Sequence, residues 1–361
     1  VLAAWLSTCG LLAQPTQTRN LVLFTSDGVR WQEVFRGADP AMLESEDHGM
    51  KDALAVRRRF RGASAEERRE HLMPFFWKVI ARQGAVFGNR DKGSTVRLRN
   101  RYWFSYPSYS EILTAKPQDD VVNSNENRPN PSETVLEILR RELDLPPEKV
   151  AVFASWETFR GISAHTPGSI YVNAGYDPVP RPPTDWARRL SEAQMDLPTP
   201  WRSVRHDYVT FELALEHLRT ARPRVLYIAL GETDEWAHED RYDRYLEMIH
   251  YFDRCLERLW NLLQSLPEYR GRTTLLVATD HGRGSDASSW QRHGQRVPEA
   301  QYVWLAVVGP DTPALGEQAA GEEISHTAIA PTMLSLMGLD PGLLKGATSG
   351  PLRQVLSRQS Q

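Results

Sequence analysis

Aspartate and histidine residues recur in this sequence in short motifs whose spacing suits the binding of divalent metal ions. Asp234 and His238 are four residues apart, which places both side chains on one face of a helical turn. Asp280 and His281 are adjacent after an apolar run, and Asp27 follows another such run. Asp oxygen and His nitrogen are ligands of Zn²⁺, and two ions about 4 Å apart can stabilise an in-line displacement at phosphorus. These residues therefore predict a metal-dependent hydrolytic site.

Each motif also has a purely structural interpretation when it is taken alone. Asp27-Gly28 is typical of a turn, and an Asp and a His four residues apart often form a surface pair. Asp280-His281-Gly282 could simply end a strand. The set is more specific than its members, because the motifs follow predicted strands in a regular order.

The elements that would position these residues alternate between strands and helices. Nearly continuous apolar runs predict buried strands at residues 20–25, 149–154, 224–230, 273–279 and 302–308. Helical patterns occupy residues 132–143, with Ser132 as the N-cap, and residues 208–218, 242–263 and 327–337. This alternation predicts an α/β sandwich, in which ligands bind outside the carboxyl ends of the strands.

Five segments together resemble the alkaline phosphatase superfamily, in particular its bacterial branch related to type I phosphodiesterases and nucleotide pyrophosphatases. They are Leu21–Gly28 (LVLFTSDG), Ser105–Thr114 (SYPSYSEILT), Gly231–His238 (GETDEWAH), Thr279–Gly284 (TDHGRG) and His293-Gly294, in the order of that family. The similarity runs from about Asn20 to Gly338. It implies an alkaline phosphatase-like three-layer sandwich, in which helices cover both faces of a mostly parallel central sheet.

The resemblance also implies a role for each matched residue. One metal ion would be bound by Asp27, Asp280, His281 and the Ser105 hydroxyl, and a second by Asp234, His238 and His293. Both ions are expected to be Zn²⁺, with Mn²⁺ as the alternative. Ser105 is the expected nucleophile because it precedes the Tyr106-Pro107 step of the family, and coordination to a metal would activate its hydroxyl.

Three of these assignments have competitors in the sequence. Ser110 lies in the same turn as Ser105 and is the rival nucleophile. Asn125 resembles the Asn that binds a phosphoryl oxygen in the phosphodiesterase branch, although Asn123 and Asn127 compete and the run could consist of turn residues. His326 precedes a predicted helix and is the reserve for His293.

The implied activity is hydrolysis of phosphate esters, by a phosphodiesterase or phosphatase, through a phosphoseryl intermediate on Ser105. A sulfatase is the alternative, since Ser105–Ser108 begins like the C/S-x-P-x-R maturation signal, but Tyr109 stands where that signal requires Arg. A phosphoryl-type transferase of the same superfamily is a further alternative. A protein that only binds a ligand is disfavoured, because all seven predicted ligand and nucleophile positions hold competent residue types.

Composition and length are those of a globular protein. The chain has 361 residues, of which 41% are hydrophobic and 25% charged, so one catalytic domain is expected at residues 20–345. Residues 36–100 are rich in Arg and predict a helical insertion bordering the site, and residues 346–361 predict a C-terminal tail. A net charge of −3 argues against a nucleic-acid-binding surface. The partner that the resemblance implies is a small-molecule phosphate ester.

The beginning of the chain predicts export. Val1–Ala13 resembles the apolar part of a signal peptide, and no later run is long enough to span a bilayer. A periplasmic or secreted protein is therefore expected, and a lipid anchor at Cys9 is the less favoured alternative. The other cysteine, Cys255, lies on an apolar helical stripe, so we expect it in the core and expect no internal disulfide.

Overall fold

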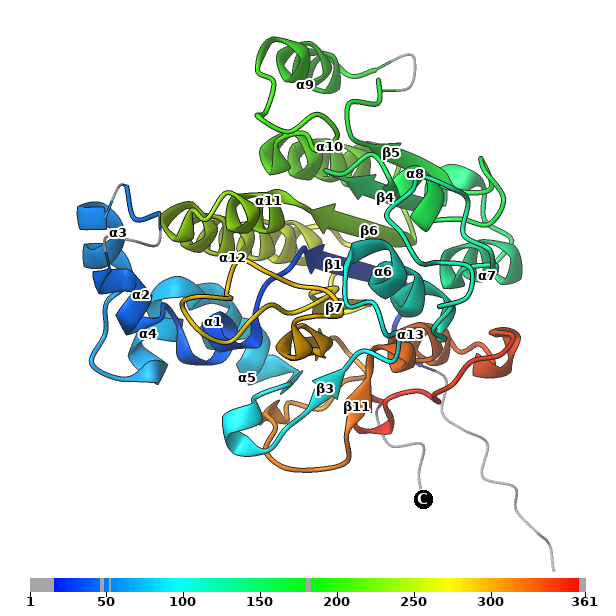
Figure 1. Cartoon of the computed structure of the whole chain (residues 1–361). Coiled ribbons are helices and arrows are strands. Elements are labelled where there is room, and N and C mark those ends of the chain that lie inside the picture. Colours follow the sequence, from blue (N-terminus) through cyan, green and yellow to red (C-terminus); the bar gives the residue numbers. More distant parts are fainter. Residues whose placement is uncertain (1–15, 46–48, 52, 180–182, 357–361) are drawn as a thin grey trace, which may run out of the picture.

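The computed structural model describes residues 16–45, 49–51, 53–179 and 183–356. A central sheet lies between two layers of helices (Figure 1). The predicted export signal and Cys9 lie outside the described residues, as does the end of the predicted tail. Within the described ranges, no helix is long and apolar enough to cross a membrane.

The central sheet has eight strands in the order β10-β2-β9-β7-β1-β6-β4-β5. Its neighbouring strands are parallel, except that β9 runs antiparallel to both β7 and β2. The strands are β1 (Asn20–Ser26), β2 (Ala85–Phe87), β4 (Val150–Ala154), β5 (Tyr171–Ala174), β6 (Val225–Leu230), β7 (Thr273–Ala278), β9 (Leu305–Val308) and β10 (Gly316–Glu317). A second sheet, in the order β11-β3-β8, consists of β3 (Val96–Arg97), β8 (Tyr302–Val303) and β11 (Ile324–Ser325).

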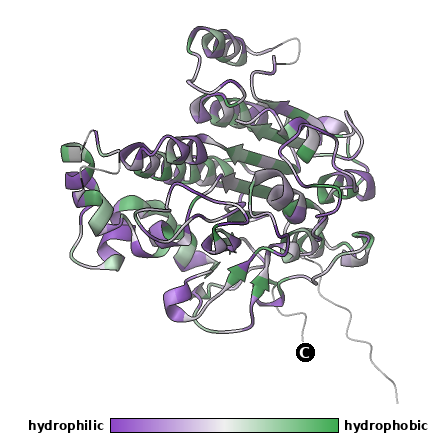
Figure 2. Ribbon diagram, viewed as in Figure 1, coloured by the Kyte–Doolittle hydropathy of each residue, from purple (hydrophilic) through white to green (hydrophobic). Residues whose placement is uncertain are grey.

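Successive side chains of the central strands pack into two separate cores. In β1, Leu21 and Leu23 pack into one core, whereas Val22 and Phe24 pack into the other. Both faces of the strand are covered, which explains why its sequence is almost continuously apolar (Figure 2). The predicted three-layer α/β sandwich with a mostly parallel sheet is thereby confirmed.

Each core is closed by its own layer of helices. The helices that cover the core of Val22 and Phe24 are α1 (Trp31–Arg36), α2 (Pro40–Glu44), α3 (Ala53–Phe60), α4 (Ala65–Leu72), α5 (Ala81–Gln83), α9 (Asp185–Asp196), α10 (Asp207–Thr220), α11 (Glu232–His238) and α12 (Tyr242–Ser265). The opposite layer is formed by α6 (Ser105–Thr114), α7 (Val135–Glu142), α8 (Phe159–Ile162) and α13 (Ile329–Leu336). Cys255 of α12 is fully buried in the first core, as predicted.

Two predicted elements differ from the observed ones for local reasons. The run at residues 302–308 is divided between β8 and β9, because the chain passes from the small sheet to the central sheet at the buried Trp304. The prediction of Ser132 as a helix N-cap is wrong: Thr134 caps α7 through a capping box with Glu137. The Ser132 hydroxyl instead donates to Gln118 Oε1 at 2.6 Å.

The predicted insertion and the described part of the predicted tail both contribute to the same fold. Residues 36–100 contain α2–α5 and also β2 and β3, so they supply strands to both sheets. The described part of the predicted tail packs against the core, where Leu352 and Val355 are buried. Its Thr348 N–H donates to the carbonyl of Ala115 at 2.8 Å.

Candidate active site

The predicted metal ligands meet because three loops leave neighbouring strands at one edge of the sheet. Strands β7, β1 and β6 are adjacent and parallel, so their carboxyl ends lie side by side. Asp27 follows β1, Asp280 and His281 follow β7, and α11 after β6 carries Asp234 and His238. The three loops therefore bring five residues, which are far apart in sequence, to one place.

The first group of ligands is arranged around His281. Its Nε2 lies 3.3 Å from Asp27 Oδ1 and 3.5 Å from Asp280 Oδ2. Its Nδ1 is 2.9 Å from the carbonyl oxygen of Gly282, which directs Nε2 toward the carboxylates. One ligand atom from each of Asp27, Asp280 and His281 lies within 4.8 Å of the other two. This group contains the three carboxylate and imidazole ligands that the sequence predicts for the first metal ion, besides the Ser105 hydroxyl.

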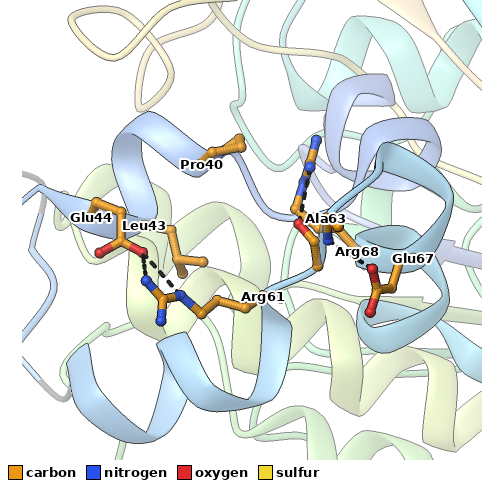
Figure 3. A pocket seen from close by; sticks show the side chains of 8 residues that line it. Pro40, Leu43, Glu44, Arg61, Ala63, Glu67 and Arg68 are labelled. Atoms are coloured by element: carbon orange, nitrogen blue, oxygen red, sulfur yellow. Dashed lines mark hydrogen bonds and ion pairs between the residues drawn. The ribbon is translucent and has the colours of Figure 1, made fainter.

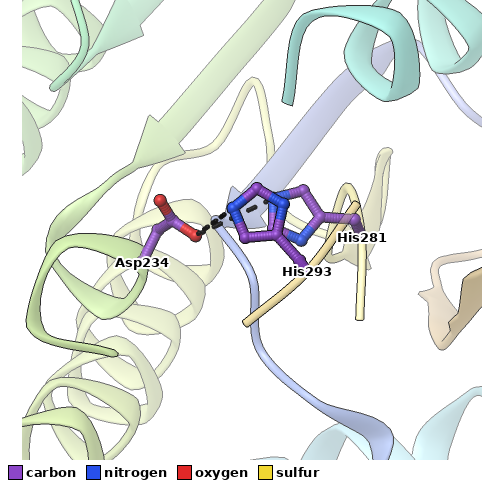
Figure 4. A group of neighbouring side chains, drawn as sticks. All are labelled: Asp234, His281 and His293. Carbon is purple, nitrogen blue, oxygen red and sulfur yellow. Dashed lines mark ion pairs between the residues drawn. The ribbon is translucent and has the colours of Figure 1, made fainter. Parts of the chain in front are cut away.

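The second group lies beside the first and extends toward solvent. His238 Nε2 is 3.1 Å from Asp234 Oδ2 and 3.1 Å from His293 Nε2. Figure 4 shows Asp234 directed toward the rings of His281 and His293, whose centroids are 4.0 Å apart. Ligand atoms of Asp234, His281 and His293 also lie within 4.8 Å of one another. All three residues predicted for the second ion are therefore together, and His281 lies where the two groups meet.

Ser105 is the serine that reaches this cluster. It is the first residue of α6, and its Oγ lies 3.5 Å from His281 Nε2. The N-terminus of a helix favours negative charge, including that of an alkoxide. Ser110 lies one and a half turns farther along, where its hydroxyl accepts hydrogen bonds from Gln118 Nε2 and Asn130 Nδ2. Of the two candidate nucleophiles, only Ser105 is at the metal ligands.

The two remaining candidates lie in different surroundings. Asn125 is exposed, and its Oδ1 accepts a hydrogen bond from the N–H of Tyr106 at 3.0 Å, which fixes the amide next to the nucleophile. Asn127 instead contacts the carbonyl of Glu157 at 3.4 Å. His326 is fully buried in the turn that packs against α6, where burial lowers its pKa to about 3. It belongs to neither ligand group among the described residues.

A further set of groups, which the sequence analysis did not identify, holds the three carboxylates. The Tyr109 hydroxyl donates to Asp27 Oδ2 at 3.1 Å, and the Gly28 N–H donates to Asp280 Oδ1 at 3.0 Å. The guanidinium of Arg283 pairs with Asp234 Oδ1. Two signals were present in the sequence: Tyr109 stands one helical turn after Ser105, and Arg283 lies within the TDHGRG motif.

The charges and the unpaired atoms of the cluster fit divalent cations. Asp27 Oδ1 and Asp280 Oδ2 are buried and have no hydrogen-bond partner. Burial and the charge of Asp27 raise the pKa of Asp280 to about 7. Burial acts to lower the pKa of His281, but the charges of Asp280 and Asp27 outweigh it and raise that pKa to about 9. A bound cation would replace the proton on His281 and leave the carboxylates ionised, as metal ligation requires.

A hollow of about 360 Å³ lies elsewhere on the molecule and is separate from this chemistry. It is formed by α2, α4 and the chain before α4, and is lined by Pro40, Leu43, Glu44, Arg61, Gly62, Ala63, Glu67 and Arg68 (Figure 3). An ion pair of 2.6 Å joins Arg61 and Glu44 across one side. None of the predicted catalytic or metal-binding residues lines it.

The fold and part of the sequence have known counterparts. Residues 205–341 match the family model of the Metalloenzyme superfamily. Among solved structures, wild-type alkaline phosphatase PafA is 10% identical, with a TM-score of 0.60 over 96% of this chain and 100% of that chain.

Two further structures cover slightly less of this chain. The phosphonate monoester hydrolase SpPMH of Silicibacter pomeroyi is 13% identical, with a TM-score of 0.57 over 94% of this chain and 77% of that one. The 2-O GAG sulfatase BT1596 is 14% identical, with a TM-score of 0.54 over 95% of this chain and 76% of that one. No curated protein matches the sequence significantly. The family model thus covers residues 205–341, and the fold is shared with these solved structures over nearly the whole chain.

Proposed function

We propose that this protein is a two-metal hydrolase of phosphate esters that acts through a phosphoseryl intermediate on Ser105. The observation that carries the proposal is the position of the Ser105 hydroxyl. It lies at a helix N-terminus and 3.5 Å from His281 Nε2, at the residue where two groups of metal ligands meet. A nucleophile in that position can be activated and the developing charge can be neutralised at the same place.

The residues divide into two ligand sets in this proposal. Asp27, Asp280, His281 and Ser105 would hold one ion, and Asp234, His238 and His293 the other. Two divalent ions, Zn²⁺ or Mn²⁺, would lower the pKa of the serine hydroxyl and neutralise charge on the phosphoryl oxygens. The side chain of His238 is 48% exposed, so substrate and water would reach the second set from that side.

The chemistry of the chain itself consists of two displacements. Ser105 Oγ loses its proton to solvent and attacks phosphorus, the bond to the ester oxygen breaks, and the alcohol leaves after taking up a proton. Water then attacks the phosphoseryl group, which still carries the second ester group when the substrate is a diester, and Ser105 Oγ leaves and is reprotonated. The N-terminus of α6 stabilises the alkoxide in both steps. Each displacement inverts the configuration at phosphorus, so net retention is expected.

Two features favour a phosphate diester over a monoester. Asn125, held by the N–H of Tyr106, offers a neutral amide donor to a phosphoryl oxygen. The arginine nearest to the ligands, Arg283, is buried and occupied by Asp234 and by backbone carbonyls, so it is not available to bind a phosphate. A diester carries less negative charge than a monoester and has less need of such a cation.

A sulfatase remains the second candidate, because one of the similar structures is a sulfatase. The residue at the position of the Arg in the maturation signal argues against it. Tyr109 is fully buried and its hydroxyl contacts Asp27, so this position serves the metal ligands. Phosphate esters are therefore the favoured substrates.

The test compares chromogenic phosphate diester, phosphate monoester and sulfate ester substrates in the presence of Zn²⁺ or Mn²⁺. We expect the diester to be hydrolysed fastest, and Ser105→Ala to lower kcat by about 10³-fold or more. Ser110→Ala, on the same helix, is the matched control and should retain activity. Intact-protein mass spectrometry of quenched wild type should show one covalent adduct on the protein: a phosphoryl group with the monoester, and a phosphoryl group that still carries the second alcohol with the diester. Dominant sulfate hydrolysis, or full activity of Ser105→Ala, would contradict the proposal.

A further inference from the structure

The three ligand carboxylates share one arrangement. In each, one oxygen is held by a donor from the protein and the other faces an imidazole. Asp27 is held by the Tyr109 hydroxyl and Asp280 by the Gly28 N–H, and their free oxygens face His281. Asp234 is held at Oδ1 by the guanidinium of Arg283, and its Oδ2 faces His238. The same Oδ1 also lies 3.8 Å from Nε2 of both His281 and His293. Arg283 thus occupies for the second ligand set the place that neutral donors occupy for the first.

Arg283 also joins the chain segments that carry the ligands. Its Nε donates to the carbonyl of Gly28 at 3.0 Å, next to Asp27. Its Nη1 donates to the carbonyl of Gln291 at 2.8 Å, two residues before His293. Its Nη2 donates to the carbonyl of Asp234 at 3.2 Å. One side chain therefore holds the loop after β1, the start of α11 and the loop of His293 in fixed relative positions.

The packing around this side chain leaves little freedom. The Arg283 side chain has 0% exposure, so its charge has no contact with water to replace these partners. Gly28 lies directly against it: a Cβ there would be 2.8 Å from Arg283 Nε and 2.8 Å from Asp234 Oδ1. The φ of +61° at Gly28 also favours glycine. The close contact between the loop after β1 and the guanidinium therefore requires glycine at position 28.

We propose that Arg283 is a positioning residue for the second metal site, which fixes the Asp234 carboxylate and joins the segments that carry Asp234, His238 and His293. The inference rests on the proposed function in that the cluster must bind metal ions. A planar guanidinium can donate from three nitrogens to partners in different directions, whereas a lysine ammonium has a single nitrogen. Arg283→Lys should therefore keep the positive charge but lose the hydrogen bonds that join the three segments.

The experiment measures metal binding rather than turnover. Wild type, Arg283→Lys and Arg283→Gln are stripped with a chelator and titrated with Zn²⁺ by calorimetry, and the bound metal is counted after gel filtration. Co²⁺ absorption spectra and the metal-induced rise in Tm are recorded in parallel. His238→Ala serves to identify which binding step belongs to the second site.

Arg205 provides the matched control for the loss of a buried arginine. It is also fully buried, but it donates to Thr210 Oγ1 and Asn173 Oδ1, both at 2.8 Å, and contacts no predicted metal ligand. Arg205→Lys should lower stability and leave two ions bound with wild-type affinity.

We expect both Arg283 variants to lose about 10- to 100-fold in affinity for one ion, the same ion that His238→Ala loses, and to show a smaller metal-induced rise in Tm. Wild-type affinity for both ions in the Arg283 variants would overturn the inference, as would equal weakening of both ions. Failure of both Arg283 variants to fold, while Arg205→Lys folds, would also overturn it, because Arg283 would then be required for folding of the protein rather than for metal binding. If wild type itself binds no pair of ions, the proposed function fails instead.

Discussion

Replacement of Tyr109 by Phe tests whether the nucleophile helix orients a metal ligand. The Tyr109 hydroxyl is fully buried and donates to Asp27 Oδ2 at 3.1 Å, while Asp27 Oδ1 has no hydrogen-bond partner and faces His281. Phe fills nearly the same volume, so the change removes one hydrogen bond and little packing. Without the donor, the carboxylate can rotate and no longer presents Oδ1 toward His281.

The expected magnitude follows from the kind of bond that is lost. A buried hydrogen bond to a charged group contributes about 1.5–3 kcal/mol. Since about 1.4 kcal/mol corresponds to a factor of ten, affinity for the ion held by Asp27, Asp280 and His281 should fall by about 10- to 100-fold. At saturating metal, kcat/KM should recover in part, because the ligands themselves remain.

The assay is a calorimetric titration of the metal-free protein with Zn²⁺, combined with kcat/KM for a phosphate diester across metal concentrations. Tyr227→Phe is the control: Tyr227 is also fully buried and lies near Tyr109 through Phe159, but its hydroxyl contacts Thr25 at 3.2 Å. If Tyr109→Phe binds both ions as tightly as wild type, the reasoning about carboxylate orientation is refuted.

Three further predictions concern Asn125, Glu111 and Asp207. Asn125→Ala should lower kcat/KM for a diester by about tenfold and leave metal affinity unchanged. Asn127→Ala is the control and should leave kcat/KM unchanged. Equal effects of the two substitutions in steady-state assays would show that Asn125 does not bind the substrate. Burial raises the pKa of Glu111 from 4.5 to about 7, so its contribution to stability is present below about pH 4.5 and is lost as pH rises through 7. Urea unfolding of Glu111→Gln at about pH 5 and about pH 8 should therefore show a weaker pH dependence than wild type, and an unchanged dependence would exclude this assignment. Asp207 accepts from the N–H groups of Gly231 and Glu232 at the start of α11, so Asp207→Asn should lower the free energy of unfolding by about 1–3 kcal/mol in denaturant titrations; a change below about 0.5 kcal/mol would argue against this anchor.

Local patterns in the sequence determine the elements and the type of site. The continuous apolar runs predict buried parallel strands because side chains on both faces must be covered. The Asp and His motifs fall at strand ends, and the structure has those ends where the sequence predicts them to within one or two residues for β1, β4, β6 and β7. The division of the run at 302–308 could not be predicted, because each half is apolar and only its pairing partners differ.

Only the tertiary structure shows how these residues reach one cluster. The strand order β7-β1-β6 places three loops side by side, and no local pattern specifies that order. The positions of α6 and of the loop that carries His293 bring Ser105 rather than Ser110, and His293 rather than His326, to the ligands, as the family resemblance implies. The contacts of Arg283 and Tyr109 join residues that are tens to hundreds of positions apart in the chain. Such contacts depend on how whole layers pack, so a motif can supply the correct residue types while the fold selects among them.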